Sequence, residues 1–202
     1  MPEALSILLA LIAGLGLLLH IGSALLAAQR YLRRPPEHEN PEQKDWPLIT
    51  VIRPVCGVDT FDAETLESTF AQDYPRFEIL FCAAHERDPA VPLVRRLIKA
   101  HPGVTARLLI GEQSLTANPK LNNMFKAYVA ARGDWLAMID ANLLIPRDYL
   151  RQLMTTWDGQ TGLVSAPPAG NRPGNLWGAL ECAFLNGNQA RWQLAADSLG
   201  LG

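Results

Sequence analysis

The sequence predicts an α/β protein in which helices cover a mostly parallel sheet, with one membrane-spanning helix ahead of it. The first observation is that apolar, β-branched segments alternate with helical patterns from residue 48 onward, at intervals of about 25 to 30 residues. Such alternation is typical of βαβ units with right-handed crossovers. The second observation is an uncharged, apolar N-terminal stretch. The length of 202 residues suits one folded domain with such an appendage.

The N-terminal stretch from Ala4 to Ala28 carries no formal charge over 25 positions. About 20 helical residues cross a bilayer, so residues 1–29 are predicted to form a transmembrane helix. A cleaved signal peptide fits less well, because the apolar run is too long and no Lys or Arg precedes it. Arg30, Arg33 and Arg34 follow at once, and the positive-inside rule then places the rest of the chain in the cytoplasm. The predicted location is the inner or plasma membrane.

The region after the span divides into a polar linker and a folded domain. Residues 30–47 are rich in Pro, Glu and Asn, which indicates a linker that holds the domain off the bilayer. The domain is expected to occupy residues 48–202. Its predicted strands cover residues 48–52, 77–82, 105–110, 135–139 and 162–166, and its predicted helices cover residues 62–70, 89–100 and 120–131. Gly133 is expected to close the last of these helices.

Polar side chains gather where the predicted strands end, and in a parallel sheet these ends meet at one edge. Asp140 and Asn142 follow the strand at 135–139, and such a pair can hold a divalent cation and, through it, a diphosphate. The alternative is that Asp140 only caps the next helical turn. Lys120, Asn122 and Asn123 suit an anionic diphosphate, because they lie at a helix start where free main-chain N–H groups also point outward. The other polar residues at the strand ends are Arg53, Asp59, His85, Glu86 and Asp88. Solvated surface polarity explains each cluster taken separately.

Several function classes lack support in the sequence. The net charge of −2, with no clustered basic face interleaved with aromatic residues, argues against nucleic-acid binding. No Gly-x-Gly-x-x-Gly follows a predicted strand and no Gly-x-x-x-x-Gly-Lys-Ser/Thr motif occurs, which argues against dinucleotide dehydrogenases and P-loop enzymes. Cys56, Cys82 and Cys182 are widely spaced, so they predict neither a metal site nor a redox centre.

Six short motifs occur in order between residues 48 and 170. They are Arg-Pro-Val-Cys-Gly-Val-Asp (53–59), Asp-Tyr-Pro-Arg-Phe-Glu-Ile-Leu-Phe-Cys (73–82), Asp-Pro-Ala (88–90), Ala-Arg-Leu-Leu-Ile-Gly (106–111), Asn-Pro-Lys-Leu-Asn-Asn (118–123) and Ile-Asp-Ala-Asn (139–142). This succession resembles the ceramide glucosyltransferase family, the family 21 glycosyltransferases, and is closest to its bacterial hopanoid-biosynthesis members. The motif at 118–123 is the most specific of the six.

The resemblance implies a GT-A fold and the inverting transfer of glucose or N-acetylglucosamine from a UDP-sugar to a membrane lipid hydroxyl, of hopanoid or ceramide type. It implies that Asp140 matches the family's second aspartate, which helps to coordinate Mg²⁺ or Mn²⁺ on the diphosphate. Asn142 stands where a carboxylate would bind the ion more strongly. The donor-binding residues expected from strand-end placement and resemblance together are Arg53, Asp59, His85, Glu86, Asp88, Lys120, Asn122 and Asn123.

The sequence departs from the family pattern at two places. The family's first aspartate, which contacts the nucleotide base, falls at His85, so that role passes to Glu86 or Asp88. The third aspartate, the expected general base, and the Gln/Arg-x-x-Arg-Trp motif are not found, so the catalytic base is unknown and the chain is expected to be a C-terminally truncated member holding the donor half. Two alternatives remain: transfer to a polyprenyl phosphate, and a catalytically inactive, membrane-tethered protein that binds nucleotide sugars.

Overall fold

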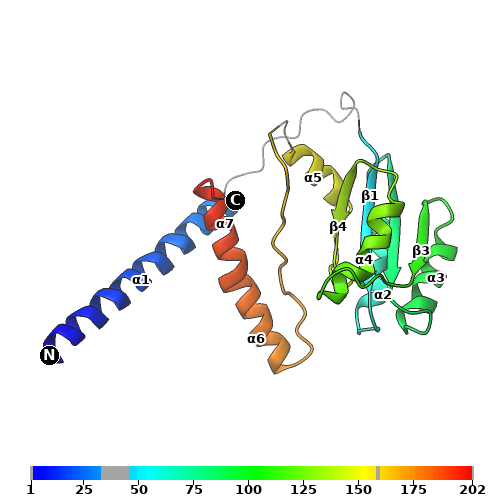
Figure 1. Ribbon diagram of the computed structural model, residues 1–202. Coiled ribbons are helices and arrows are strands. Elements are labelled where there is room, and N and C mark those ends of the chain that lie inside the picture. Colours follow the sequence, from blue (N-terminus) through cyan, green and yellow to red (C-terminus); the bar gives the residue numbers. More distant parts are fainter. Residues whose placement is uncertain (1, 33–45, 158–159, 202) are drawn as a thin grey trace. The chain divides into compact units, whose positions relative to one another are not determined.

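The computed structural model describes residues 2–32, 46–157 and 160–201, and Figure 1 shows its ribbon. The chain forms two compact units, one of Asn40–Val164 and the other of Met1–Glu39 with Ser165–Gly202. Residues 33–45, which make up most of the predicted linker, lie outside the described residues, as do Arg33 and Arg34. The linker at 30–47 and the domain limits at 48 and 202 therefore stay predictions.

A four-stranded parallel sheet forms the centre of the unit Asn40–Val164. Its strands are β1 (Ile49–Val55), β2 (Phe77–Ala83), β3 (Ala106–Ile110) and β4 (Trp135–Met138), and they lie in the order β3-β2-β1-β4. The chain moves outward from β1 to β3 and then returns to the far side of β1, where β4 pairs with it. Ligands of open α/β sheets bind at such a reversal, beyond the carboxyl ends of the strands. The predicted parallel α/β fold is confirmed.

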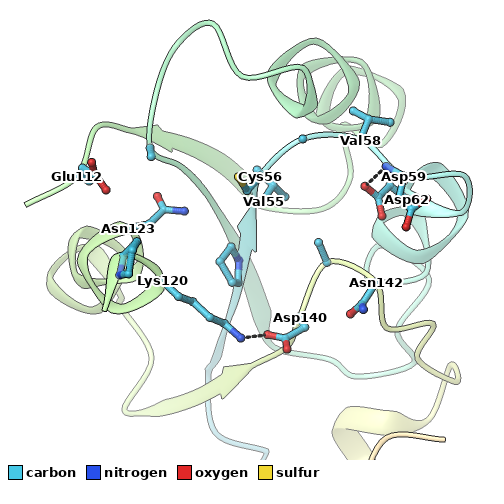
Figure 2. Close-up of a pocket in the computed structure, with 15 residues that line it drawn as sticks. Val55, Cys56, Val58, Asp59, Asp62, Glu112, Lys120, Asn123, Asp140 and Asn142 are labelled. Carbon is cyan, nitrogen blue, oxygen red and sulfur yellow. Dashed lines mark hydrogen bonds and ion pairs between the residues drawn. The ribbon is translucent and has the colours of Figure 1, made fainter. Parts of the chain in front are cut away.

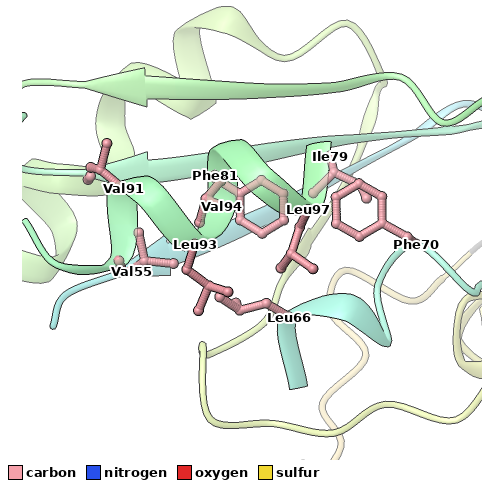
Figure 3. Packing of buried hydrophobic residues seen from close by; sticks show 11 residues of the cluster. Val55, Leu66, Phe70, Ile79, Phe81, Val91, Leu93, Val94 and Leu97 are labelled. Atoms are coloured by element: carbon pink, nitrogen blue, oxygen red, sulfur yellow. The ribbon is translucent and has the colours of Figure 1, made fainter. Parts of the chain in front are cut away.

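Helices cover both faces of this sheet (Figure 1). The face that carries Ile79 and Phe81 packs against α2 (Asp62–Glu67) and α3 (Ala90–Ala100), and α5 (Tyr149–Thr156) covers the same face beside β4. The other face, which carries Leu80, packs against α4 (Pro119–Ala130). Successive strand side chains point to opposite faces, so the uninterrupted apolar run of β2 supplies both layers. Figure 3 shows the first cluster, in which each fully buried side chain contributes about 1.5–3 kcal/mol.

The predicted strand at residues 162–166 is absent, because this part of the described chain lies outside the sheet. Its large apolar residue, Leu163, is 82% exposed, so no burial favours pairing. The predicted end of the first strand at residue 52 is also wrong, since β1 continues through Arg53 to Val55 in register with β2. The prediction that Gly133 closes a helix is wrong as well, since α4 ends at Ala130. A Cβ at Gly133 would lie 2.5 Å from the carbonyl oxygen of Leu48, so the chain needs glycine there to pass β1.

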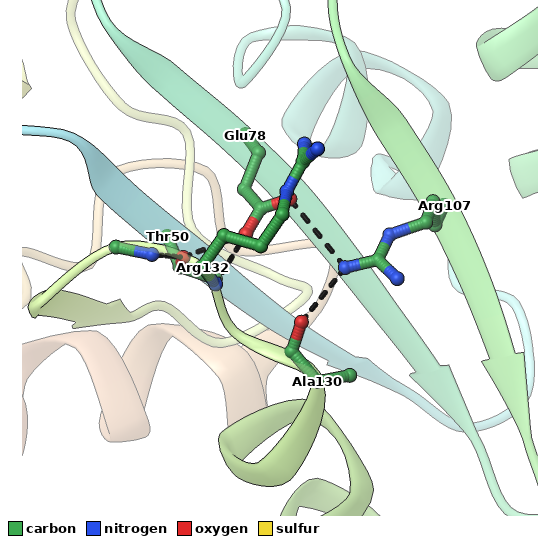
Figure 4. A network of polar contacts seen from close by, with 6 residues as sticks. Thr50, Glu78, Arg107, Ala130 and Arg132 are labelled. Carbon is green, nitrogen blue, oxygen red and sulfur yellow. Dashed lines mark hydrogen bonds and ion pairs between the residues drawn. The ribbon is translucent and has the colours of Figure 1, made fainter.

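Glu78 is a buried carboxylate near the amino end of β2, at the opposite end of the sheet from the reversal crevice (Figure 4). It accepts hydrogen bonds from the Thr50 hydroxyl at 2.9 Å, from the Arg132 main-chain N–H at 2.8 Å and from Arg132 Nε at 2.9 Å. Arg107 lies 3.5 Å from the same carboxylate. Burial raises the pKa of Glu78, but the hydrogen bonds from Arg132 and Thr50 outweigh burial and leave the pKa below its ordinary value. The network ties β1, β2 and the turn before β4 together.

The other unit consists of α1 (Pro2–Leu32) with the C-terminal helices α6 (Leu176–Phe184) and α7 (Ala190–Ser198), joined by the π-helical turn η2 (Leu185–Gln189). The predicted N-terminal helix is confirmed. Among the described residues, it is the one helix long and apolar enough to cross a membrane; its apolar window has a mean hydropathy of 2.5 and no buried residue. α1 is therefore a candidate membrane span.

Candidate active site

A cavity of about 660 Å³ opens at the carboxyl ends of β1 and β4, where the strand order reverses. Its walls come from the end of β1 and the following loop, from the first turns of α4, and from the turn after β4. Ala84 after β2 and Glu112 after β3 complete the lining. Half of the ten residues predicted from the sequence line it, namely Asp59, Lys120, Asn123, Asp140 and Asn142 (Figure 2). The cavity is the place where the sheet brings these distant residues together.

Asp140 lies two residues after β4, and the preceding Ile139 still donates its N–H to the Ile52 carbonyl at 3.0 Å. The Asp140 side chain is half exposed and accepts a hydrogen bond from Nζ of Lys120 across the cavity. Within the described part of the chain, Lys120 is the hydrogen-bond partner of this carboxylate, and α5 begins only at Tyr149. The alternative that Asp140 caps the next helical turn is therefore wrong.

Three further carboxylates line the cavity, from Asp59, Asp62 and Glu112. Asp62 accepts the Asp59 main-chain N–H at 2.8 Å, and both lie across the cavity from Lys120 in Figure 2. Lys120 is the one Lys or Arg among the lining residues. An anion entering the cavity therefore meets four carboxylates, whose repulsion a bound cation would offset.

Asp62 and Glu112 are not among the site residues predicted from the sequence. The spacing Asp59-x-x-Asp62 at a helix start is a local signal for the first of them, similar to a capping box. Glu112 follows β3 with only Gly111 between, so the strand-end rule that selected Asp140 applies to it as well.

The start of α4 is capped by the protein itself. The Asn118 side chain accepts the N–H groups of Lys120 at 3.0 Å and Leu121 at 3.4 Å, and the Asn118 carbonyl accepts the N–H of Asn122 at 3.1 Å. Pro119 has no N–H to offer. The expectation that free main-chain N–H groups of this helix face a diphosphate is therefore wrong, and the Lys120 side chain is what this helix start presents to an anion.

The two asparagines that follow fix nearby loops. Asn122 is buried, accepts the N–H groups of Leu115 and Thr116, and donates to the Thr116 carbonyl at 2.9 Å, so it holds the loop ahead of α4 and does not line the cavity. Asn123 lines the cavity and donates to the Cys82 carbonyl at 2.9 Å, which ties α4 to β2. A role for either residue in donor binding stays a proposal.

The loop after β2 reaches the cavity through Ala84 alone. His85 and Glu86 are exposed outside the lining, and Glu86 forms an ion pair with Arg95 at 2.7 Å. Asp88 accepts the N–H groups of Gly57 at 2.9 Å and Ala90 at 2.8 Å, so it fixes the start of α3 and the loop after β1. Contact of Glu86 or Asp88 with a nucleotide base, and a donor-binding role for His85, stay predictions.

Arg53 is fully buried in β1 and lies outside the cavity lining. Its guanidinium donates to the carbonyl oxygens of Thr65 at 2.8 Å, Ala141 at 3.3 Å and Leu143 at 3.2 Å. Burial lowers the pKa of Arg53 to about 10, while Asp140 and Asp62 act to raise it, so the group stays charged at neutral pH. Arg53 therefore holds the turn after β4 in place.

Replacing Arg53 with methionine is expected to weaken the binding of a Mn²⁺–nucleotide complex by about 10-fold. Loss of a residue that orients a metal ligand typically weakens metal binding by about 10- to 100-fold, and the expected value is the lower limit of that range. The physical reason is that the carbonyls of Ala141 and Leu143 lose the donor that fixes the turn. Titration calorimetry on the full chain measures the change. Arg53→Lys keeps the charge and is expected to lose less; equal losses in both variants would contradict a role for that charge.

Asp140 and Asn142 offer hard oxygen donors, which Mg²⁺ and Mn²⁺ prefer. Among the described residues, no group of three or more His, Cys, Asp or Glu side chains is arranged to hold a metal ion. The donor set therefore fits such an ion only where a ligand such as a diphosphate, or water, supplies further oxygens.

Comparison with known proteins decides the family. The model of glycosyl transferase family 21 matches residues 10–202. The chain belongs to this family. Its relatives include ceramide glucosyltransferase 1 of Caenorhabditis elegans, 35% identical over 158 residues that cover 77% of this chain and 34% of the relative. The ceramide glucosyltransferase of Komagataella phaffii is 38% identical over 129 residues, covering 56% and 25%.

The family predicted from the six motifs is thus confirmed, while the hopanoid-type placement within family 21 stays a prediction. The matched regions cover between 22% and 38% of the length of these curated relatives. Among solved structures, the mannosyltransferase PcManGT from Pyrobaculum calidifontis, in complex with GDP-Man and Mn²⁺, matches with a TM-score of 0.59 and 26% identity. The match covers 89% of this chain and 50% of that one, and it confirms the predicted GT-A-like fold.

Proposed function

We propose that this family 21 chain carries the donor site of a membrane-bound glycosyltransferase that moves a sugar from a UDP-sugar to a lipid hydroxyl, with inversion. The observation that carries the proposal is the Asp140–Lys120 pair inside the cavity at the strand-order reversal. Relatives named ceramide glucosyltransferases support a lipid acceptor of ceramide or hopanoid type, and glucose or N-acetylglucosamine as the sugar. The domain faces the cytoplasm from the inner or plasma membrane, with α1 as the span.

The proposed donor chemistry rests on charge. Asp140 and Asn142 would hold Mg²⁺ or Mn²⁺, which when bound stabilises the negative charge of the leaving UDP. The mannosyltransferase solved with GDP-Man and Mn²⁺ supports a divalent ion. Lys120 is close enough to hydrogen-bond Asp140, so its ammonium also lies near a diphosphate held by that aspartate. Asp59 and Asp62 suit hydroxyl groups of the ribose or the sugar, because carboxylates accept hydrogen bonds.

Acceptor activation needs a base within hydrogen-bond reach of the lipid hydroxyl. We assign no residue of this chain to that step. The stretch Gln189-Ala190-Arg191-Trp192 is one residue shorter than the Gln/Arg-x-x-Arg-Trp motif. Its Arg191 contacts His20 of α1, at 2.9 Å and 3.1 Å, within its own unit.

The test is titration of UDP-glucose, UDP-N-acetylglucosamine and GDP-mannose into the full chain in detergent micelles, with Mn²⁺, with Mg²⁺ and with chelator. Binding of a UDP-sugar that depends on the metal is the expected result. Tighter binding of GDP-mannose would contradict the UDP assignment, and binding unaffected by chelator would contradict the metal.

A second experiment supplies radiolabelled donor and a lipid extract to the full chain, and characterises the lipid product. An acid-stable glycolipid with inverted anomeric configuration supports the proposal. An acid-labile product would indicate a polyprenyl-phosphate acceptor instead. Donor binding with no product would favour the inactive, membrane-tethered alternative.

A further inference from the structure

Helix α6 carries an exposed apolar face made of Leu176, Trp177, Leu180 and Phe184. These side chains are 72%, 77%, 53% and 59% exposed, respectively. At about 100° of rotation per residue, all four fall on roughly one third of the helix circumference. Single exposed apolar residues are common, but a contiguous set of this size marks an interaction surface.

The opposite face of α6 contacts the loop that precedes it. Asn186, just beyond α6, accepts the Gly170 N–H at 2.8 Å and donates to the Gly170 carbonyl at 2.7 Å. A Cβ at Gly170 would lie 2.6 Å from Sγ of Cys182, so loop and helix approach as closely as glycine allows. A Cβ at Gly178 would lie 3.5 Å from Cα of Pro173, which is ordinary van der Waals contact. These contacts fix which face of α6 remains outward, and that face is the apolar one.

Helix α7 connects α6 to the second half of α1, within one compact unit. Arg191 contacts His20, and Asp197 forms an ion pair with Arg30 at 3.1 Å, so the two helices run in the same direction. Ser23 and Ala27 of α1 are buried, as are the α7 residues Ala190 and Ala195. Small side chains at such positions let two helices approach closely. Helix α7 is therefore held beside the second half of the candidate membrane span, and α6 precedes the α7 residue that contacts His20, within the same unit.

We propose that the apolar face of α6 lies in the surface layer of the bilayer that α1 crosses, as an interfacial helix. The partner is lipid because the face is uncharged and belongs to the same unit as α1, whose apolar window is wholly exposed. Nine residues are too few to span the hydrocarbon core, which needs about 20. The exposed Glu181 beside the face also keeps α6 out of that core, whereas Trp177 suits the membrane–water boundary.

The test places an environment-sensitive fluorophore on single cysteines of the full chain in liposomes, in a background of Cys56→Ser and Cys182→Ala with the buried Cys82 retained. The probe positions are Trp177→Cys and Leu180→Cys. Leu15→Cys on α1 is the control for the membrane interior, and Arg87→Cys, an exposed position in the other unit, is the control for water. Lipids with quenchers at shallow or deep acyl positions report the depth of each probe.

The expected result is a blue-shifted emission at both α6 positions, with the strongest quenching by the shallow quencher. Emission and quenching like those of the Arg87 position would overturn the proposal, because the face would then lie in water. A blue shift without lipid quenching would also overturn it, because protein would then cover the face. Quenching strongest at the deep position, as for Leu15, would mean insertion into the core and would equally exclude an interfacial helix. None of these outcomes depends on the proposed sugar transfer.

Discussion

Replacing Asp140 with alanine is expected to lower the affinity of the chain for UDP-glucose with Mn²⁺ by more than about 100-fold. Loss of a residue that only supports a metal ligand costs up to about 100-fold, and loss of a ligand itself is expected to cost more. The variant removes the carboxylate that follows β4 in the cavity, and with it the strongest oxygen donor for the ion. Without Mn²⁺, the variant is expected to bind UDP-glucose no worse than wild type, because one repelling carboxylate is gone and Lys120 is released. Titration calorimetry in detergent micelles measures both affinities.

Asp134→Asn is the matched control, since Asp134 is an exposed carboxylate just before the other end of β4. It is expected to leave the affinity unchanged with and without Mn²⁺. If Asp140→Ala kept metal-dependent binding of wild-type strength, the ion would have to be held elsewhere and the assignment of Asp140 would be withdrawn.

Replacing Glu78 with leucine is expected to lower the free energy of unfolding by about 3 kcal/mol. The reason is that the buried Thr50 hydroxyl and the Arg132 main-chain N–H lose their acceptor. The Arg132 and Arg107 side chains are 58% and 43% exposed, so water solvates their charges and limits the loss. Urea unfolding of the full chain, followed by tryptophan fluorescence, gives the change.

Two comparisons isolate the buried acceptor from the surface charges. Arg107→Gln removes an exposed partner at 3.5 Å and is expected to cost at most about 1 kcal/mol. Glu78→Gln keeps an acceptor for Thr50 and the Arg132 N–H, so its loss is expected to lie between the other two. A leucine variant as stable as Arg107→Gln would show that the network contributes little.

The lowered pKa of Glu78 gives this stability a pH dependence. Because the folded-state pKa lies below the unfolded value of about 4.3, the contribution is complete above that value and is lost as the pH falls through the folded-state pKa. Wild type is therefore expected to lose stability on acidification below about pH 4.3, and Glu78→Leu is expected to lose less over the same interval. If the free energy of unfolding fell equally steeply with pH in the two proteins, the pH dependence could not be assigned to Glu78.

The sequence predicted the candidate site well where the signal was local. Asp140 and Lys120 follow from a strand end and a helix start, and parallel strands bring such ends to one edge. The same rule selected Arg53 and Asp88, yet the structure places both outside the cavity, bonded mainly to main-chain groups. The carbonyl that Arg53 meets on Leu143 lies 90 residues away, and local patterns carry no information about such a partner.

By itself, the sequence determined the apolar N-terminal helix, the alternation of strands and helices, and the family, because hydrophobic period and short motifs are properties of neighbouring residues. Only the tertiary structure decided that β4 returns beside β1, that Glu78 gathers its donors from separate elements, and that α6 keeps one apolar face uncovered. These features depend on which distant segments pack together. Tertiary contacts between these segments set the free energy of burial and of hydrogen bonding. A short stretch of sequence does not specify those contacts.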